Sequence, residues 1–159
     1  MAGLLKTLGI SLICLILDQV SKFAVARRMV LHQSIPVIGS FFQLTYIHNP
    51  GAAFGIAIGG RLFYILFATI AIILIGVVLY RSSNSAFSIQ LSFAMILGGA
   101  LGNLIDRIRL GEVIDFLDFG IGLWRWPVFN VADAFVTSGI ILLSFCYLVR
   151  RDAERHREN

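Results

Sequence analysis

Residues 62–80 read LFYILFATIAIILIGVVLY, a run without a charged side chain, with Arg61 and Arg81 at its two ends. A helix that crosses the hydrocarbon core of a bilayer, which is about 30 Å thick, needs about 20 mostly apolar residues. The run has this length and this composition. Residues 62–80 are therefore predicted to form a membrane-spanning helix.

Three other segments are similar in length and apolar character: residues 4–26, 86–105 and 131–149. The first and the last contain a few ionisable side chains, whereas the middle one contains none. The sequence therefore predicts a membrane all-α protein with four transmembrane helices. The whole chain, residues 1–159, is expected to form a single integral membrane domain.

The composition of the chain agrees with this prediction. Apolar residues make up 58% of the 159 residues and charged residues 14%, whereas soluble domains have about 45–50% and about 25%. Lys and Arg outnumber Asp and Glu by 13 to 9. In a membrane protein such an excess sets the orientation more often than it binds nucleic acid. A soluble enzyme and a nucleic-acid-binding protein are therefore excluded.

With four spans, two long connections share the side of the membrane opposite both termini: residues 27–61 and 106–130. Residues 41–47 (FFQLTYI) and 113–119 (VIDFLDF) are rich in aromatic and β-branched residues, which predicts two short strands. Trp124 and Trp126 suit the headgroup level of a bilayer. The connections are therefore expected to form a small β-rich cap that rests on the membrane.

The orientation is suggested by basic residues near the span ends. Six of the 13 lie in the terminal segments or in the short loop after residue 80: Lys6, Arg81, Arg150, Arg151, Arg155 and Arg157. The total numbers of basic residues on the two sides leave the orientation open. The density of basic residues near the span ends predicts cytoplasmic termini and an extracytoplasmic cap. A competing interpretation makes residues 4–26 a cleaved secretory signal, although Asp18 and Lys22 interrupt the approach to the supposed cleavage site.

Ionisable residues in or beside a span are candidates for function, because burying them in a bilayer is costly. Lys22 follows Asp18 by one helical turn, which also allows a purely structural ion pair. Asp106 and Arg107 can be interpreted as an ordinary helix-end pair. Asp133 has no basic neighbour in the sequence and lies in the first turn of the last span, where the helix dipole would also favour it.

A second carboxylate is available beside Asp133. Asp115 and Asp118 lie three residues apart in a predicted strand, so they face opposite sides and only one can point toward Asp133. Two close carboxylates share one proton near neutral pH. The ionised one can take a proton from water while the protonated one polarises a peptide carbonyl.

Other chemistries lack their residues. Ser138-Gly139 has no glycine two residues before the serine, and no GxGD motif is present. The two cysteines and three histidines form no ligand pattern, so neither a metal nor a cofactor is expected.

In residues 98–102, GGALG, Gly98 and Gly102 form a GxxxG motif that predicts a close helix approach, with Asn103 against a neighbouring helix.

Five blocks of sequence occur in a fixed order: DQVSK at 18–22, NPGAAFG at 49–55, GGALGNLIDR at 98–107, VIDF at 113–116 and PVFNVAD at 127–133. Together they resemble lipoprotein signal peptidase, also called signal peptidase II, a bacterial family of intramembrane aspartyl proteases. The chain departs from the family pattern at Gly55, where serine is frequent, and at Ala134-Phe135, where a small polar residue is frequent.

This resemblance implies that Asp115 and Asp133 are the catalytic dyad. It also implies residues that bind substrate or support the site: Asp18, Lys22, Asn49, Gly51, Asn103, Arg107 and Asn130. The implied substrate is a prolipoprotein whose cysteine carries diacylglyceryl, cut just before that cysteine in the bacterial inner membrane. Membrane lipids and globomycin-type inhibitors are further implied partners, and no cofactor is implied.

Two other functions compete with a protease. A small carrier or channel would line its path with polar residues, but the polar residues of this chain gather at one membrane face. The second and fourth spans carry no acidic or basic residue at mid-depth. A non-catalytic membrane scaffold is the remaining alternative.

Overall fold

The computed structural model describes residues 2–51, 60–82 and 85–158. Four long helices are present: α1 (Ala2–Arg28), α2 (Arg61–Arg81), α3 (Phe87–Arg109) and α4 (Val131–Glu158). Each contains an apolar stretch long enough to cross a membrane, which confirms the four predicted spans. Helix α3 continues beyond residue 105, so Asp106 and Arg107 belong to the helix and not to the following connection.

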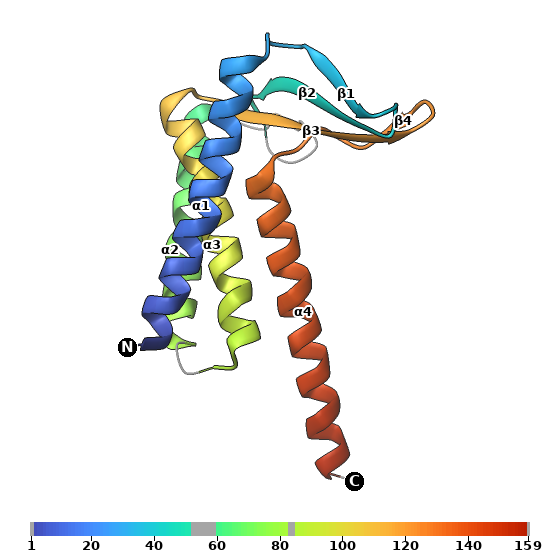
Figure 1. Cartoon of the computed structure of the whole chain (residues 1–159). Helices are drawn as coiled ribbons and strands as arrows, with labels where there is room; N and C mark the ends of the chain where they lie inside the picture. Colours follow the sequence, from blue (N-terminus) through green and yellow to red (C-terminus); the bar gives the residue numbers. More distant parts are fainter. Residues whose placement is uncertain (1, 52–59, 83–84, 159) are drawn as a thin grey trace.

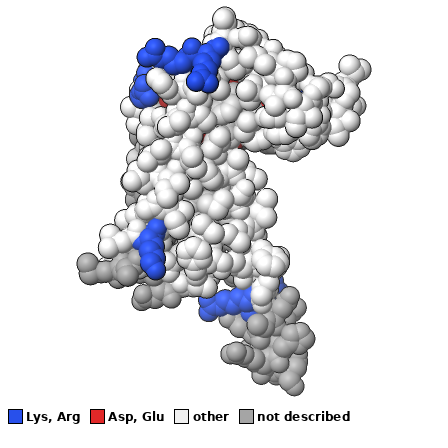
Figure 2. Space-filling model, viewed as in Figure 1, with Lys and Arg blue, Asp and Glu red and all other residues white. Residues whose placement is uncertain are grey.

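The helices are arranged around α3, which contacts α1, α2 and α4. Helix α1 begins and α4 ends at the same end of the bundle, and the β-sheet lies over the other end (Figure 1). The two long connections therefore meet on one side, as the sequence predicts. Figure 2 shows basic side chains toward both ends of this face and an uncharged surface between them, as a membrane-spanning bundle requires.

Helix α1 buries only one of its faces. Its buried residues recur every three or four positions: Thr7, Ser11, Cys14, Asp18, Lys22 and Val25. Residues three and four apart lie on one face of a helix. Large apolar side chains between them, such as Leu12 and Ile16, are exposed and suit contact with lipid. Residues 4–26 therefore form part of a helix packed against the bundle.

Glycines of α3 allow the helices to approach closely. A Cβ atom at Gly98 would lie 2.5 Å from the carbonyl oxygen of Ser11, and one at Gly102 would collide with the Asp18 carboxylate. On another side of α3, a Cβ atom at Gly99 would collide with the carbonyl oxygen of Ala132. The GxxxG motif thus brings α1 against α3, as predicted, and Gly99 extends this close packing to α4.

The sheet contains four antiparallel strands in the order β1-β2-β3-β4: β1 (Ser34–Ile38), β2 (Phe42–Asn49), β3 (Val113–Ile121) and β4 (Trp124–Arg125). Strands β2 and β3 are the two predicted strands, and both extend beyond their predicted ends. Their pairing places Ile47 opposite Asp115 and Asn49 opposite Val113. The end of β2 therefore reaches the predicted site.

A small apolar core joins the sheet to the bundle. Val25 in the last turns of α1 and Met29 just after this helix pack with Tyr46 of β2 and with Ile114 and Phe116 of β3. These side chains are at most 9% exposed. Because Asp115 lies between two of the core residues, this core fixes the height of its carboxylate relative to α1.

Candidate active site

A cavity of about 410 Å³ lies where β3 and the segment before α4 meet α3 and α4. Asp115 and Asp133 both line it, whereas Asp118 is not among its lining residues. Amide and basic side chains add to its polar wall: Asn49, Asn103 and Arg107. Residues 126–129 and the first turns of α4 provide its apolar wall. The cavity therefore combines two carboxylates with an apolar surface.

Asp115 is held in β3 and is only 1% exposed. Its two carboxylate oxygens accept hydrogen bonds from Asn49 Nδ2 at 2.9 Å and from Asn130 Nδ2 at 2.6 Å. Burial raises the pKa of Asp115 to about 6; the Asp133 charge adds to this rise, and the two amide donors oppose it. Asp115 therefore exchanges its proton much closer to neutral pH than an ordinary aspartate.

Asp133 lies in the first turn of α4 and takes part in the cap of that helix. Its N–H group donates to Asn130 Oδ1 at 2.9 Å, while the Asn130 N–H group donates to Asp133 Oδ2 at 3.3 Å. Such a reciprocal pair satisfies N–H groups that have no partner within the helix. The other carboxylate oxygen, Oδ1, accepts a hydrogen bond from Asn103 Nδ2 at 2.8 Å.

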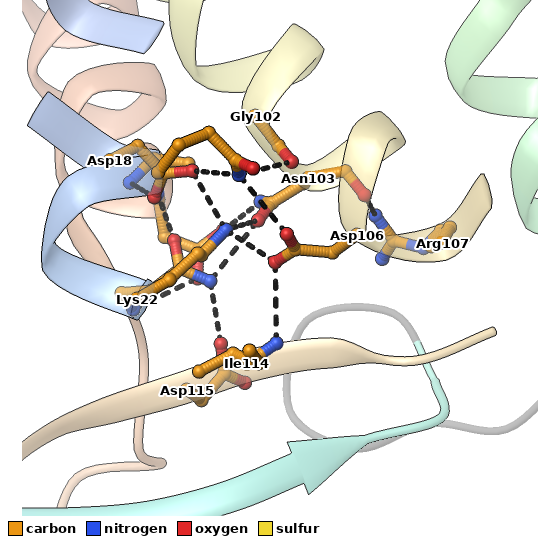
Figure 3. Close-up of polar contacts among 12 residues, drawn as sticks. Asp18, Lys22, Gly102, Asn103, Asp106, Arg107, Ile114 and Asp115 are labelled. Carbon is orange, nitrogen blue, oxygen red and sulfur yellow. Dashed lines mark hydrogen bonds and ion pairs between the residues drawn. The ribbon is translucent and has the colours of Figure 1, made fainter. Parts of the chain in front are cut away.

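Lys22 joins α1 to this site (Figure 3). Its Nζ atom lies 2.9 Å from Asp18 Oδ2 and 2.8 Å from Asp106 Oδ2, and it donates to Asn103 Oδ1 at 2.9 Å. The predicted ion pair of Asp18 and Lys22 is therefore present. All three charged side chains are at most 3% exposed. Asn103 forms the direct link between this cluster and Asp133.

The helix-end pair suggested for Asp106 and Arg107 is wrong. Asp106 points toward α1 and binds Lys22, and its Oδ2 atom accepts the Ile114 N–H at 3.3 Å. Gln19 Nε2 donates hydrogen bonds to Asp18 Oδ2 at 3.1 Å and to Asp106 Oδ1 at 3.0 Å. Consecutive residues of a helix do not face each other. The side chains of Asp106 and Arg107 are therefore poorly placed to form an ion pair with each other.

The sequence did contain a signal for Asp106. Residues 98, 102 and 106 are four apart, so Asp106 lies on the GxxxG face that meets α1. Asp106 and Gln19 were both missed as site residues. Together with Ala132, whose N–H donates to Asp18 Oδ1 at 2.9 Å, they connect the beginning of α4 and the beginning of β3 to the buried cluster.

Arg107 fixes the chain that follows Asn49. Its Nη2 atom donates to the Gly51 carbonyl oxygen at 3.2 Å, and Nη1 donates to the Asn103 carbonyl oxygen at 3.2 Å. The guanidinium also lies over the Tyr64 ring, 5.6 Å from its centroid. Arg107 thus holds the edge of the cavity. Residues 52–55 of the predicted motif, including Gly55, lie outside the described residues.

Asp118 belongs to a separate group of contacts. Its carboxylate accepts a hydrogen bond from the Thr45 hydroxyl at 2.6 Å and forms an ion pair with Arg125 Nε at 2.7 Å. These contacts join β2, β3 and β4. As the strand prediction required, Asp115 and Asp118 have different partners, and Asp115 is the one that lines the cavity with Asp133.

These features define the class of the protein. It is a multi-pass membrane protein with a carboxylate-lined cavity where a small sheet covers one end of four helices. A sequence profile described as signal peptidase (SPase) II matches residues 10–149. The chain belongs to this family, and it is therefore a membrane protease and not a carrier, channel or scaffold.

Individual relatives agree. The lipoprotein signal peptidase of Syntrophus aciditrophicus is 46% identical over 134 residues, which cover 81% of this chain and 83% of the relative. That of Desulforapulum autotrophicum is 44% identical over 148 residues, covering 90% and 91%. A bacterial membrane enzyme solved by the in meso method at 2.3 Å has a TM-score of 0.78 and 34% identity, covering 90% of this chain and 87% of that chain. The predicted family and fold are confirmed.

Proposed function

We propose that the protein is an aspartic endopeptidase that removes the signal peptide from diacylglyceryl-modified prolipoproteins. The cut falls just before the lipidated cysteine, and Asp115 and Asp133 form the catalytic dyad. The observation that carries this proposal is the placement of both carboxylates in one cavity of a chain that belongs to the signal peptidase II family. The whole chain is proposed to act as one membrane-embedded unit.

The proposed reaction needs only water and the two carboxyl groups. One carboxylate takes a proton from water while the water oxygen bonds to the scissile carbonyl carbon. The carbonyl oxygen takes the proton of the other carboxyl group, which gives a tetrahedral diol. The first carboxyl then gives its proton to the leaving nitrogen, the second takes a proton back from the diol, and the C–N bond breaks. The dyad returns to its starting state.

The remaining polar residues are proposed to bind the peptide or to hold the dyad. Arg107 and Asn49 line the cavity, where a peptide backbone can exchange hydrogen bonds with them, and Gly51 supports both through its backbone N–H and carbonyl groups. Asn103 and Asn130 contact the carboxylates directly. Asp18 and Lys22 support the site from α1. Globomycin-type inhibitors are proposed to occupy the same cavity.

The position of the cavity suits a lipid-modified substrate. It lies between the sheet and the membrane-spanning part of α4, and its apolar wall continues to Val136 of α4. The acyl chains of the substrate can remain in the bilayer while the scissile bond reaches the carboxylates. Trp124 and Leu123, on the β3–β4 hairpin, are 87% and 100% exposed, which suits contact of this sheet with membrane lipids.

The proposed orientation places both termini in the cytoplasm and the sheet on the extracytoplasmic face of the bacterial inner membrane. It is supported by the basic residues near the termini and in the loop after α2. Reporter fusions after residue 159 and within residues 27–61 should give opposite signals. Equal signals would contradict this orientation.

The test of the function is turnover of a purified diacylglyceryl-modified precursor in detergent. Asp115→Asn and Asp133→Asn should each abolish turnover. Asp118→Asn is the matched control, because it keeps an acceptor oxygen for Thr45 and lies outside the cavity; this variant should retain cleavage. Substantial turnover by a folded Asp133→Asn protein would exclude the proposed mechanism.

A further inference from the structure

Three asparagines present N–H groups to the dyad. Asn49 and Asn130 each donate to one oxygen of Asp115, and Asn103 donates to Oδ1 of Asp133. An asparagine amide has a donor end and an acceptor end of almost equal size. If it turns over, it offers a carbonyl oxygen where it offered an N–H group. The dyad therefore depends on whatever fixes each amide.

Two of the amides are fixed by the backbone. Asn49 Oδ1 accepts the Gly51 N–H at 2.9 Å, and Asn130 Oδ1 accepts the Asp133 N–H at 2.9 Å. Asn103 Oδ1 is held differently, by Lys22 Nζ at 2.9 Å and by Asn130 Nδ2 at 3.1 Å. A hydrogen bond from an ammonium group is roughly twice as strong as one between neutral groups. Lys22 is therefore the stronger of the two anchors of Asn103.

All three donors of Lys22 have partners, and one of these partners is Asn103. An ammonium group has three N–H donors, and those of Lys22 have three acceptors: Asp18 Oδ2, Asp106 Oδ2 and Asn103 Oδ1. The side chain is 2% exposed and is not among the residues that line the cavity. Its hydrogen-bonded link to Asp133 runs through Asn103, and its charge also lowers the pKa of Asp115.

The two members of the dyad differ in environment. Asp133 is partly exposed in the first turn of α4, where the helix dipole favours a negative charge, whereas Asp115 is 1% exposed. The raised pKa of Asp115 agrees with this difference. Of the other charged groups nearby, Arg107 lines the same cavity, and Asp18 and Asp106 are bound to Lys22.

We propose that Lys22 is a positioning residue that fixes the Asn103 amide so that Asp133 always receives its N–H group. Asp133 is thereby kept as the ionised member that takes the proton from water, and Asp115 as the member that gives its proton to the carbonyl oxygen. This assignment rests on the proposed function and adds to it the division of roles within the dyad. The proton transfers are the same as in the proposed hydrolysis, with Asp133 as the first carboxyl group and Asp115 as the second.

The test compares two double variants. Lys22→Met with Asp106→Asn removes the ammonium together with one carboxylate, so the net charge of the buried cluster is unchanged. Lys22→Gln with Asp106→Asn is the matched control, because the glutamine amide can still donate to Asn103 Oδ1. We measure kcat, KM and the pH dependence of kcat with the lipidated precursor, and thermal unfolding of the same samples.

In the Met variant, kcat should fall about 10- to 100-fold while KM changes less than about twofold. The pH dependence of kcat should change as well, because a turned amide offers a carbonyl oxygen to Asp133 in place of an N–H group. The Gln variant should recover most of kcat and the original pH profile. Equal kcat and equal pH profiles in the two variants would overturn the assignment.

Asn103→Asp keeps the proposal testable if the Met variant does not fold. It preserves an acceptor for Lys22 but removes the N–H group from Asp133, so kcat should fall although the protein is stable. Full kcat in this variant would also overturn the assignment. Asp115→Asn and Asp133→Asn are measured beside it. Turnover by either variant would refute the catalytic dyad. If both are inactive while the Lys22 variants behave alike, only the positioning role of Lys22 is refuted.

Discussion

Two groups of carboxylates lie in one hydrogen-bonded network but have different surroundings. Asp18 and Asp106 share the ammonium group of Lys22 at 2.9 and 2.8 Å. Asp115 and Asp133 instead accept hydrogen bonds from asparagine amides and a backbone N–H group. Asp18 and Asp106 are thus bound to a buried cation, whereas burial raises the pKa of Asp115 to about 6 against the opposing effect of its amide donors. In the proposed function, the first group braces the fold while the second performs the chemistry.

The largest expected effect is on the dyad. Asp115→Asn and Asp133→Asn should each reduce turnover of the lipidated precursor by at least about 10²-fold, because either loss prevents proton exchange. The double variant should be hardly slower than either single variant, since the two residues act as one unit. Thermal unfolding should show no loss of stability, because one of two crowded like charges is removed. Residual turnover that follows the folded fraction would instead indicate a structural role.

The opposite result is expected for the cluster around Lys22. Lys22→Met alone leaves two buried carboxylates without their cation, and breaking a buried ion pair in this way costs about 3–5 kcal/mol. The variant should unfold at a clearly lower temperature in detergent. Adding Asp106→Asn should recover part of this loss. A single variant as stable as the wild type would mean that the cluster does not brace the fold.

Composition and periodicity predicted the membrane-spanning helices and two of the four strands. Long apolar runs located the four spans, and the aromatic and β-branched stretches located β2 and β3. Strand β1 was missed because all of its residues are exposed and it contains Pro36. Strand β4 has only two residues. Both strands exist because a neighbouring strand pairs with them, which no local pattern records.

The site was predictable to a similar degree. Asp115 and Asp133 were distinguished by strand alternation and by the lack of a basic neighbour, and the cavity brings them together. The role of Asp106 was missed because its partner Lys22 lies 84 positions earlier in the chain and the adjacent Arg107 suggested a local pair. The contact between Lys22 and Asp106 thus depends on the close packing of α1 and α3 at Gly98 and Gly102.

The third prediction concerns the dependence of stability on pH. The pKa of Asp115 rises on folding from 3.8 to about 6, so the folded protein binds a proton that the unfolded chain releases. This contribution is fully present below about pH 4 and is lost as the pH rises through 6, by up to about 3 kcal/mol. The difference in unfolding temperature between wild type and Asp115→Asn should therefore change between pH 4 and 7. A constant difference would contradict the raised pKa.

The smallest expected effect is a shift in the pH profile of turnover. The proposed mechanism requires a proton on Asp115, so turnover should decline as the pH rises through the pKa of that residue. The Asn49 amide donates to Asp115 at 2.9 Å and lowers this pKa. Asn49→Ala removes the donor, and the decline should move to higher pH, by roughly half a unit to one unit. Asn49→Asp retains an acceptor for the Gly51 N–H but places a negative charge beside Asp115, so its decline should move further. The order wild type, Ala, Asp along the pH axis would show that neutral donors tune the dyad. A shift to lower pH in either variant would mean that Asp115 does not hold the proton.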